Sequence, residues 1–156
     1  MNAPVDAPSR EVILTRVFDA PLQLVWTAWT DPRHLAQWWG PKMFTNPVCE
    51  LDLRVGGAIT IHMCAPNGTV YPMTGTFKEI VPPTRLVFTS VARDNDGNAL
   101  LEGHNVITFE DVGGKTKVTV QSRAVGLVPI APQMLAGMEA GWTQSLEKLA
   151  GLVEGR

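Results

Sequence analysis

The chain has 156 residues, of which 45% are hydrophobic and 18% are charged, and its formal net charge is −2 at pH 7. This length and composition are typical of one globular domain with a sizeable core. The slightly acidic balance argues against nucleic acid and anionic membranes as partners, and no apolar run approaches the roughly 20 residues that span a bilayer. The Ala- and Pro-rich residues 1–9 do not resemble a signal peptide. We therefore expect a cytoplasmic protein with a disordered tail over residues 1–9 and a single domain over residues 10–156.

Cysteine spacing and glycine motifs give no sign of a metal or a cofactor. Cys49 and Cys64 lie far apart and outside any CxxC pair, so we expect two free thiols. The glycine pairs at 56–57 and 113–114 begin neither a GxGxxG fingerprint nor a phosphate-binding loop. We expect no metal site and no cofactor.

The first part of the domain predicts one strand followed by two short helices. Residues 10–18 are rich in β-branched side chains, which favour a strand. Pro21 and Pro32 each suit the first turn of a helix, and Gly40-Pro41 suits a stop. Apolar residues then recur at helical spacing in both helices: Leu22, Val25, Trp26 and Trp29 in the first, and Leu35, Trp38 and Trp39 in the second.

From Pro47 onward the apolar residues alternate with period two. Strands are predicted near 47–53, 58–64, 69–80, 85–92, 101–110 and 116–123, separated by turns rich in Gly, Asn and Pro. Such short connections favour an antiparallel meander. The alternation predicts one dry face of the sheet, formed by Ile59, Ile61, Met63, Tyr71, Met73, Phe77, Leu86, Phe88, Ile107, Phe109, Val118 and Val120.

The last segment, over residues 129–154, predicts one long amphipathic helix. Gly137 and Gly141 inside it suggest a surface that a backbone or a ligand approaches closely. A one-sided sheet must cover its dry face, and this helix is the element long enough to do so. The expected fold is α+β, with a twisted seven-stranded antiparallel sheet around the helix and a wedge between them. A wedge that side chains do not fill becomes a pocket.

Five motifs in order resemble one known family over about residues 10–153. They are the run from Val25-Trp26 through Thr30-Asp31-Pro32 to Gln37-Trp38-Trp39-Gly40-Pro41, then Asp52-Leu53-Arg54-Val55-Gly56-Gly57, Gly75-Thr76-Phe77-Lys78-Glu79-Ile80 with Pro82-Pro83-Thr84-Arg85-Leu86, Gly114-Lys115-Thr116-Lys117-Val118-Thr119-Val120, and Gly141-Trp142 with Leu146 and Leu149. Together they resemble the bacterial branch of the Hsp90-ATPase-activator homologues (AHSA1-like) in the START-like, or SRPBCC, superfamily. The resemblance implies a helix-grip fold with a cavity, but no invariant catalytic residue.

The candidate ligand-binding residues are those expected to face the wedge. Methionine is adaptable and polarisable, and aromatic rings add apolar area, so both suit a pocket for an apolar ligand, although each could equally fill the core. The predicted ligand-binding residues are Met63, Tyr71, Met73, Phe88, Met134, Met138 and Trp142.

Tyr71 and His104 are the only catalytic candidates. The Tyr71 phenol could orient a ligand carbonyl or bond a neighbouring backbone group. His104 could act as a general acid or base if a bulge turned it inward, and is otherwise an exposed or structural histidine. No Ser, Asp or Lys is placed by a motif to complete a relay with His104.

Three functions remain open at this stage. The first is binding of a small hydrophobic or amphipathic molecule in the wedge, and the second is a cyclase or hydrolase that uses the same cavity. The third is a chaperone partner, which the resemblance alone implies, and which is weakened because eukaryotic activators carry a second, N-terminal domain. Relatives often form dimers, so a homodimer also stays open.

Overall fold

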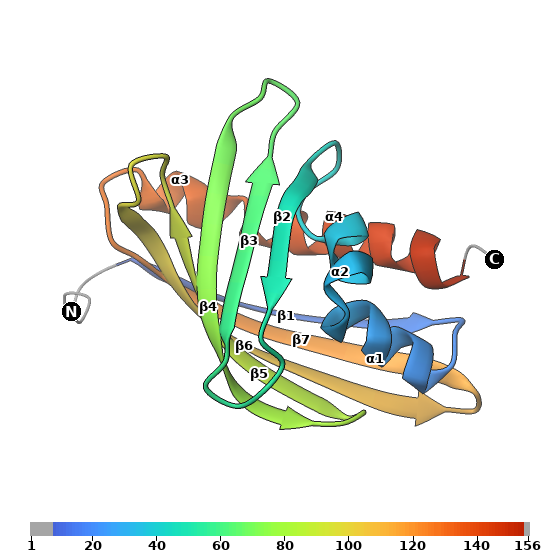
Figure 1. Ribbon diagram of the computed structural model, residues 1–156. Coiled ribbons are helices and arrows are strands. Elements are labelled where there is room, and N and C mark those ends of the chain that lie inside the picture. The colour runs from blue at the N-terminus through green and yellow to red at the C-terminus, as the bar shows by residue number, and fades with distance from the viewer. Residues whose placement is uncertain (1–7, 155–156) are drawn as a thin grey trace.

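The computed structural model describes residues 8–154, which form one seven-stranded sheet with helices on its concave side (Figure 1). All neighbouring strands are antiparallel, in the order β1-β7-β6-β5-β4-β3-β2. The expected α+β helix-grip fold is confirmed. The elements are β1 (Ser9–Phe18), α1 (Leu22–Thr30), α2 (Pro32–Trp38), β2 (Thr45–Leu51), β3 (Ala58–Cys64), β4 (Val70–Val81), β5 (Arg85–Arg93), β6 (Ala99–Val112), β7 (Lys115–Gly126), α3 (Ala131–Ala136) and α4 (Met138–Glu154).

The expected dry face is the concave face that packs against α4 and the α1–α2 pair. Ten of its twelve residues are buried, whereas Met63 is half-buried and Tyr71 is exposed. Cross-strand pairing aligns the buried residues in rows, because Leu86 pairs with Ile107 and Ile107 pairs with Val120. One continuous core therefore joins the sheet, the short helices and α4.

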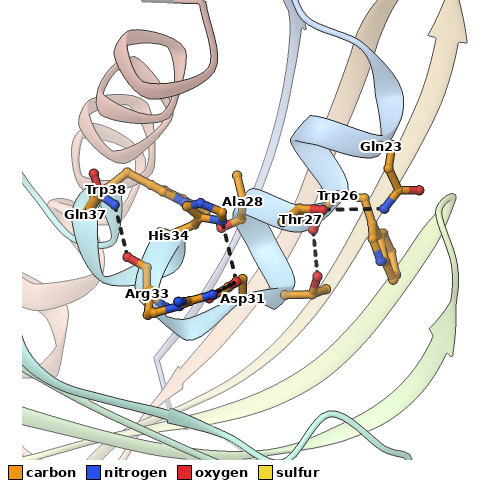
Figure 2. A network of polar contacts seen from close by, with 10 residues as sticks. Gln23, Trp26, Thr27, Ala28, Asp31, Arg33, His34, Gln37 and Trp38 are labelled. Carbon is orange, nitrogen blue, oxygen red and sulfur yellow. Dashed lines mark hydrogen bonds and ion pairs between the residues drawn. The ribbon is translucent and has the colours of Figure 1, made fainter.

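Hydrogen bonds at the corner between α1 and α2 involve two of the tryptophans, Trp26 and Trp38 (Figure 2). The carboxylate of Asp31 accepts a hydrogen bond from the backbone N–H of Arg33 and so caps α2, as the Asp-Pro pair predicts. The Trp38 indole Nε1 donates to the carbonyl of Ala28 at 2.9 Å, which ties α2 to α1. Hydrogen bonds from the guanidinium and from the backbone N–H of Arg33 hold the pKa of Asp31 below its ordinary value.

The C-terminal segment differs from the single helix expected over residues 129–154. It begins at Ala131 and is interrupted at Gly137, which separates α3 from α4. Arg10 on β1 provides the reason: its Nη1 donates to the carbonyls of Leu135 and Ala136, both at 3.0 Å. These carbonyls thus have a partner outside the helix where a continuous helix would use its own N–H groups.

Strand β1 starts one residue earlier than expected. Ser9, assigned to the tail, pairs with Val125 as the first residue of β1, and the carbonyl of Pro8 accepts a hydrogen bond from Gly126. The rest of that expectation, over residues 1–7, lies outside the described residues.

Candidate functional site

A cavity of about 220 Å³ lies between the concave face of the sheet and α4. Strands β3 to β7 form its floor and walls, α4 forms its roof, and the segment after α2 forms part of its rim. Its lining is uncharged, and consists of Trp39, Gly40, Pro41, Met63, Tyr71, Pro72, Met73, Ser90, Ala92, Leu101, Gly103, Asn105, Ser122, Ala124, Met138, Gly141, Trp142 and Ser145. The expected wedge therefore remains partly unfilled by side chains.

One wall of the cavity is aromatic and is fixed by ring contacts. The rings of Trp39 and Trp142 meet edge to face, with centroids 5.6 Å apart. Behind them, the ring of Trp29 stacks on Trp142 with centroids 6.2 Å apart. Since Trp29 also contacts Trp38 at 4.7 Å, the wall is continuous with the core of the short helices. Met63, Met73 and Met138 extend this apolar surface with flexible side chains.

Another part of the lining carries a buried polar network on three adjacent strands. Asn105 on β6 pairs with Phe88 on β5 and with Ser122 on β7, and both Asn105 and Ser122 are only 3% exposed. The Ser122 hydroxyl donates to Asn105 Oδ1 at 2.6 Å, and Asn105 Nδ2 donates to the Ser90 hydroxyl at 3.2 Å. The buried side chains of Asn105 and Ser122 are therefore satisfied without any ligand.

Two glycines shape the cavity. A Cβ atom at Gly103 would lie 2.4 Å from the Ser90 hydroxyl oxygen, so only glycine leaves room for Ser90 at its present position. Gly141 on α4 lines the cavity, and a Cβ atom there would meet nothing within 4 Å. No other backbone approaches Gly141 closely; this glycine faces the open space of the cavity.

The rim segment, residues 39–44, is held to α4 by Lys148. The Lys148 ammonium donates to the carbonyls of Gly40 and Pro41, both at 3.2 Å, and lies 3.4 and 3.5 Å from those of Phe44 and Trp39. Burial lowers the pKa of Lys148. Four carbonyl oxygens compensate for the water that the ammonium loses, and they leave its three N–H groups occupied.

Five of the seven predicted ligand-binding residues meet at this cavity, namely Met63, Tyr71, Met73, Met138 and Trp142. The other two lie elsewhere. Phe88 lines a smaller void of about 20 Å³ behind Trp39 and Met73. Met134 is half-buried on α3, the short helix before the break at Gly137, and it lines neither the cavity nor the smaller void.

The two catalytic candidates are separated. Tyr71 lies at the mouth, 39% exposed, with its ring 6.1 Å from that of Phe44. His104 is exposed on the convex side of β6, because its pairing with Thr89 is regular and the bulge that would turn it inward is absent there. The inward orientation considered for His104 is therefore wrong.

The polar network was missed by the sequence analysis, although a signal for it exists. Ser90 and Asn105 share the inward parity of Phe88 and Ile107, and Ser122 shares that of Val120. A polar residue in the inward register of a dry face marks either a buried hydrogen-bond network or a ligand contact.

The smaller void is large enough for about one water molecule. Trp29 lines it, and the indole N–H of Trp29 is buried without a hydrogen-bond partner.

Within residues 8–154, no cluster of three or more His, Cys, Asp or Glu side chains has the arrangement of a metal site. None of the helices in that range has the length and apolar character needed to cross a membrane.

Comparisons with known proteins give one matching family and several similar structures. Residues 19–154 match the profile of the family described as activator of Hsp90 ATPase homolog 1-like protein. A structure from Chromobacterium violaceum is similar at 29% identity and a TM-score of 0.78, covering 92% of this chain and 96% of that one. The AHSA1 protein from Silicibacter pomeroyi is similar at 27% identity and a TM-score of 0.78, covering 93% and 98%. A protein from Nitrosomonas europaea reaches 27% identity and a TM-score of 0.75, covering 93% and 94%. No curated protein matches the chain.

Proposed function

This chain belongs to the family of activator of Hsp90 ATPase homolog 1-like proteins, and from that premise we propose that it binds a small hydrophobic or amphipathic molecule in its cavity. The observation that carries the proposal is an uncharged cavity with an aromatic and methionine wall and a short polar stretch. Mostly apolar concave sites with a few placed polar groups are the usual form of small-molecule pockets.

The size of the cavity bounds the ligand. At about 220 Å³ it is smaller than the roughly 300–1,000 Å³ of sites for drug-sized molecules. A ligand with one or two rings fits that space. Its affinity would come mainly from apolar area removed from water, at about 25 cal/mol per Å² before the costs of association.

Filling the cavity tests the proposal. Fatty acids, flavonoids, aromatic polyketides and single-ring aromatics are titrated into the protein and followed by thermal shift and by amide NMR shifts. Met138→Trp places a large ring in the cavity and should abolish binding of every hit. Ala140→Trp puts the same ring on the exposed side of α4 and should leave binding unchanged. A hit that survives Met138→Trp binds elsewhere, and a full panel without hits contradicts the proposal.

The enzyme alternative requires at least two titratable groups that converge in the cavity. Within residues 8–154, Tyr71 is the only lining residue with a titratable side chain, and His104 faces away from the cavity. A cyclase or hydrolase is therefore less well supported than a binding protein. If the purified protein converted a bound ligand into a product, an enzyme would be better supported than a binding protein.

The chaperone-partner alternative is supported by the family membership alone. It is tested by adding the protein to a bacterial Hsp90 over a concentration series and measuring ATP hydrolysis. A saturable rise in the ATPase rate supports this alternative, and an unchanged rate removes it. The cytoplasmic location and the homodimer stay predictions.

A further inference from the structure

We propose that the ligand is neutral and carries an oxygen that accepts a hydrogen bond from the hydroxyl of Ser90. This inference rests on the proposed function, because it names the chemistry of the molecule that would occupy the same cavity. It follows from the direction of each hydrogen bond in the Ser122–Asn105–Ser90 network and from the charges around the lining.

The orientation of the Asn105 amide is determined by its neighbours. Its Nδ2 lies 3.3 Å from the carbonyl oxygen of Phe88, which can only accept a hydrogen bond. The nitrogen must therefore face Phe88, and the second N–H of the same group reaches the Ser90 hydroxyl at 3.2 Å. The amide oxygen then faces Ser122, and the 2.6 Å contact requires the Ser122 hydroxyl to donate.

One serine hydrogen of the lining remains uncommitted. The Ser122 hydroxyl donates its hydrogen to Asn105 Oδ1, and the Ser145 hydroxyl donates its hydrogen to the Gly141 carbonyl at 2.9 Å. Within the described part of the chain, Ser90 only accepts, so its O–H hydrogen is left to bind an oxygen in the cavity. Gly103 opposite Ser90 keeps that position accessible, because any Cβ atom there would collide with the hydroxyl.

The charges argue for a neutral acceptor rather than a carboxylate. Within residues 8–154, no Lys, Arg or His lines the cavity. The Lys148 ammonium at the rim is already engaged by four backbone carbonyls. A carboxylate that entered would exchange water for one hydroxyl donor and apolar walls, and a buried charge without a cationic partner is strongly disfavoured. A ketone, ether or hydroxyl oxygen does not incur this penalty.

Three small molecules of similar size test the inference. Acetophenone, cumene and benzoate each carry a substituent of three heavy atoms, branched at the carbon attached to the phenyl ring, and they differ in presenting a neutral acceptor, no acceptor and a charged acceptor. Each is titrated into labelled wild-type protein and Ser90→Ala, and the dissociation constant is taken from the amide shifts of cavity residues. Thr89→Ala, which removes a hydroxyl from the convex side of the same strand, is the matched control.

We expect Ser90→Ala to weaken acetophenone about five- to tenfold, the effect of one neutral hydrogen bond, and to leave cumene binding unchanged or slightly stronger. Thr89→Ala should change neither, and benzoate should not saturate the cavity of any variant. Equal effects of Ser90→Ala on acetophenone and cumene, or saturable benzoate binding, would overturn the inference while the proposed function stands. If cumene and acetophenone both fail to shift the cavity amides, the proposed function itself fails for ligands of one ring, and this inference fails with it.

Discussion

Met43, in the rim segment, has a backbone φ of 71° and a side chain that is 78% exposed. A non-glycine residue in this left-handed region costs roughly 1–2 kcal/mol, and asparagine tolerates it better than methionine does. Because the exposed side chain contributes little packing, Met43→Asn should raise the free energy of unfolding by about 0.5–1 kcal/mol. Urea denaturation measures the change.

Met43→Ile provides the opposite control for the backbone argument. A β-branched side chain fits the left-handed region worse than methionine, so this variant should lose stability. If Met43→Asn is less stable than the wild type while Met43→Ile is not, the strain at residue 43 does not determine the stability of the rim.

Cys49 on β2 is half-buried against the core, and burial, with a smaller contribution from Glu50, raises the pKa of its thiol to about 11. The thiolate is the reactive form, so alkylation should be slow at pH 7 and should increase until the pH nears 11. Iodoacetamide labelling of Cys64→Ser, in which Cys49 is the remaining thiol, measures the profile by mass spectrometry.

The same shift has a consequence for stability. Between the ordinary thiol pKa near 9 and the folded value, the unfolded chain loses the Cys49 proton while the folded protein keeps it, so stability falls as the pH rises through that window. Cys49→Ala should show a shallower fall over the same range. A labelling profile that levels off near pH 9 would contradict the raised pKa.

At the scale of single elements, α4 carries a glycine where it faces the cavity. Gly141→Ala replaces a poor helix former by the best one, and the new methyl group meets no atom within 4 Å. We expect the free energy of unfolding to rise by about 0.5–1 kcal/mol, while ligand affinity falls because the methyl group takes cavity volume. Chemical denaturation and ligand titration measure the two effects separately.

Gly151, on the exposed side of the same helix, is the matched control. Gly151→Ala should bring a similar gain in stability without any effect on ligand binding. If both variants bind ligand like the wild type, then Gly141 does not line the binding site.

The sequence predicts elements well where the signal is local. The Asp31 cap, Pro32 in the first turn of α2 and the period-two strands all depend on residues close together in the chain, and the structure confirms them. Pro21 differs by one position, since it is the N-cap residue of α1 and not part of its first turn. The break at Gly137 is different, since it depends on Arg10, more than a hundred residues away, which binds the carbonyls of Leu135 and Ala136. Helical periodicity contains no information about such a partner.

At the scale of the whole molecule, the cavity arises from a change in side-chain size along the strands. The inward residues of β5 to β7 are large toward the short helices, where Leu86, Ile107 and Val120 form one row. Two rows further along the strands they are small, where Ser90, Gly103 and Ala124 form another. The residues of this small row line the cavity, because their side chains do not fill the space that the larger side chains fill elsewhere.

This gradient explains what could be predicted of the site. The period-two pattern locates the inward residues, and so it finds Met63, Met73 and Tyr71. Whether Phe88 and Met134 line the cavity depends on how the helices pack on the sheet. The periodicity of the sequence contains no information about that packing. Ser90, Asn105 and Ser122 were detectable by parity, but their hydrogen bonds appear only when three strands are aligned.

Lys148 joins α4 to the rim segment, which lines the cavity at Gly40 and Pro41. Lys148→Met keeps an unbranched side chain, one atom shorter, but removes the charge and leaves the carbonyls of Gly40 and Pro41 without this donor. We expect the free energy of unfolding to fall by about 1–2 kcal/mol, since hydrogen bonds to a charged group are lost and burial of the ammonium offsets part of that loss. Amide hydrogen exchange at Gly40 and residues 42–44 should accelerate by more than the global change, because the contact is local.

Lys42→Met removes a lysine from the same rim segment and serves as the control. Its ammonium lies 3.6 Å from the Glu147 carboxylate in an exposed ion pair, which contributes about 0–1 kcal/mol. Ligand dissociation measured by NMR exchange should be faster in Lys148→Met than in Lys42→Met, because only the former frees the rim from α4. Equal dissociation rates in the two variants would mean that ligands leave by a route that does not require the rim to move.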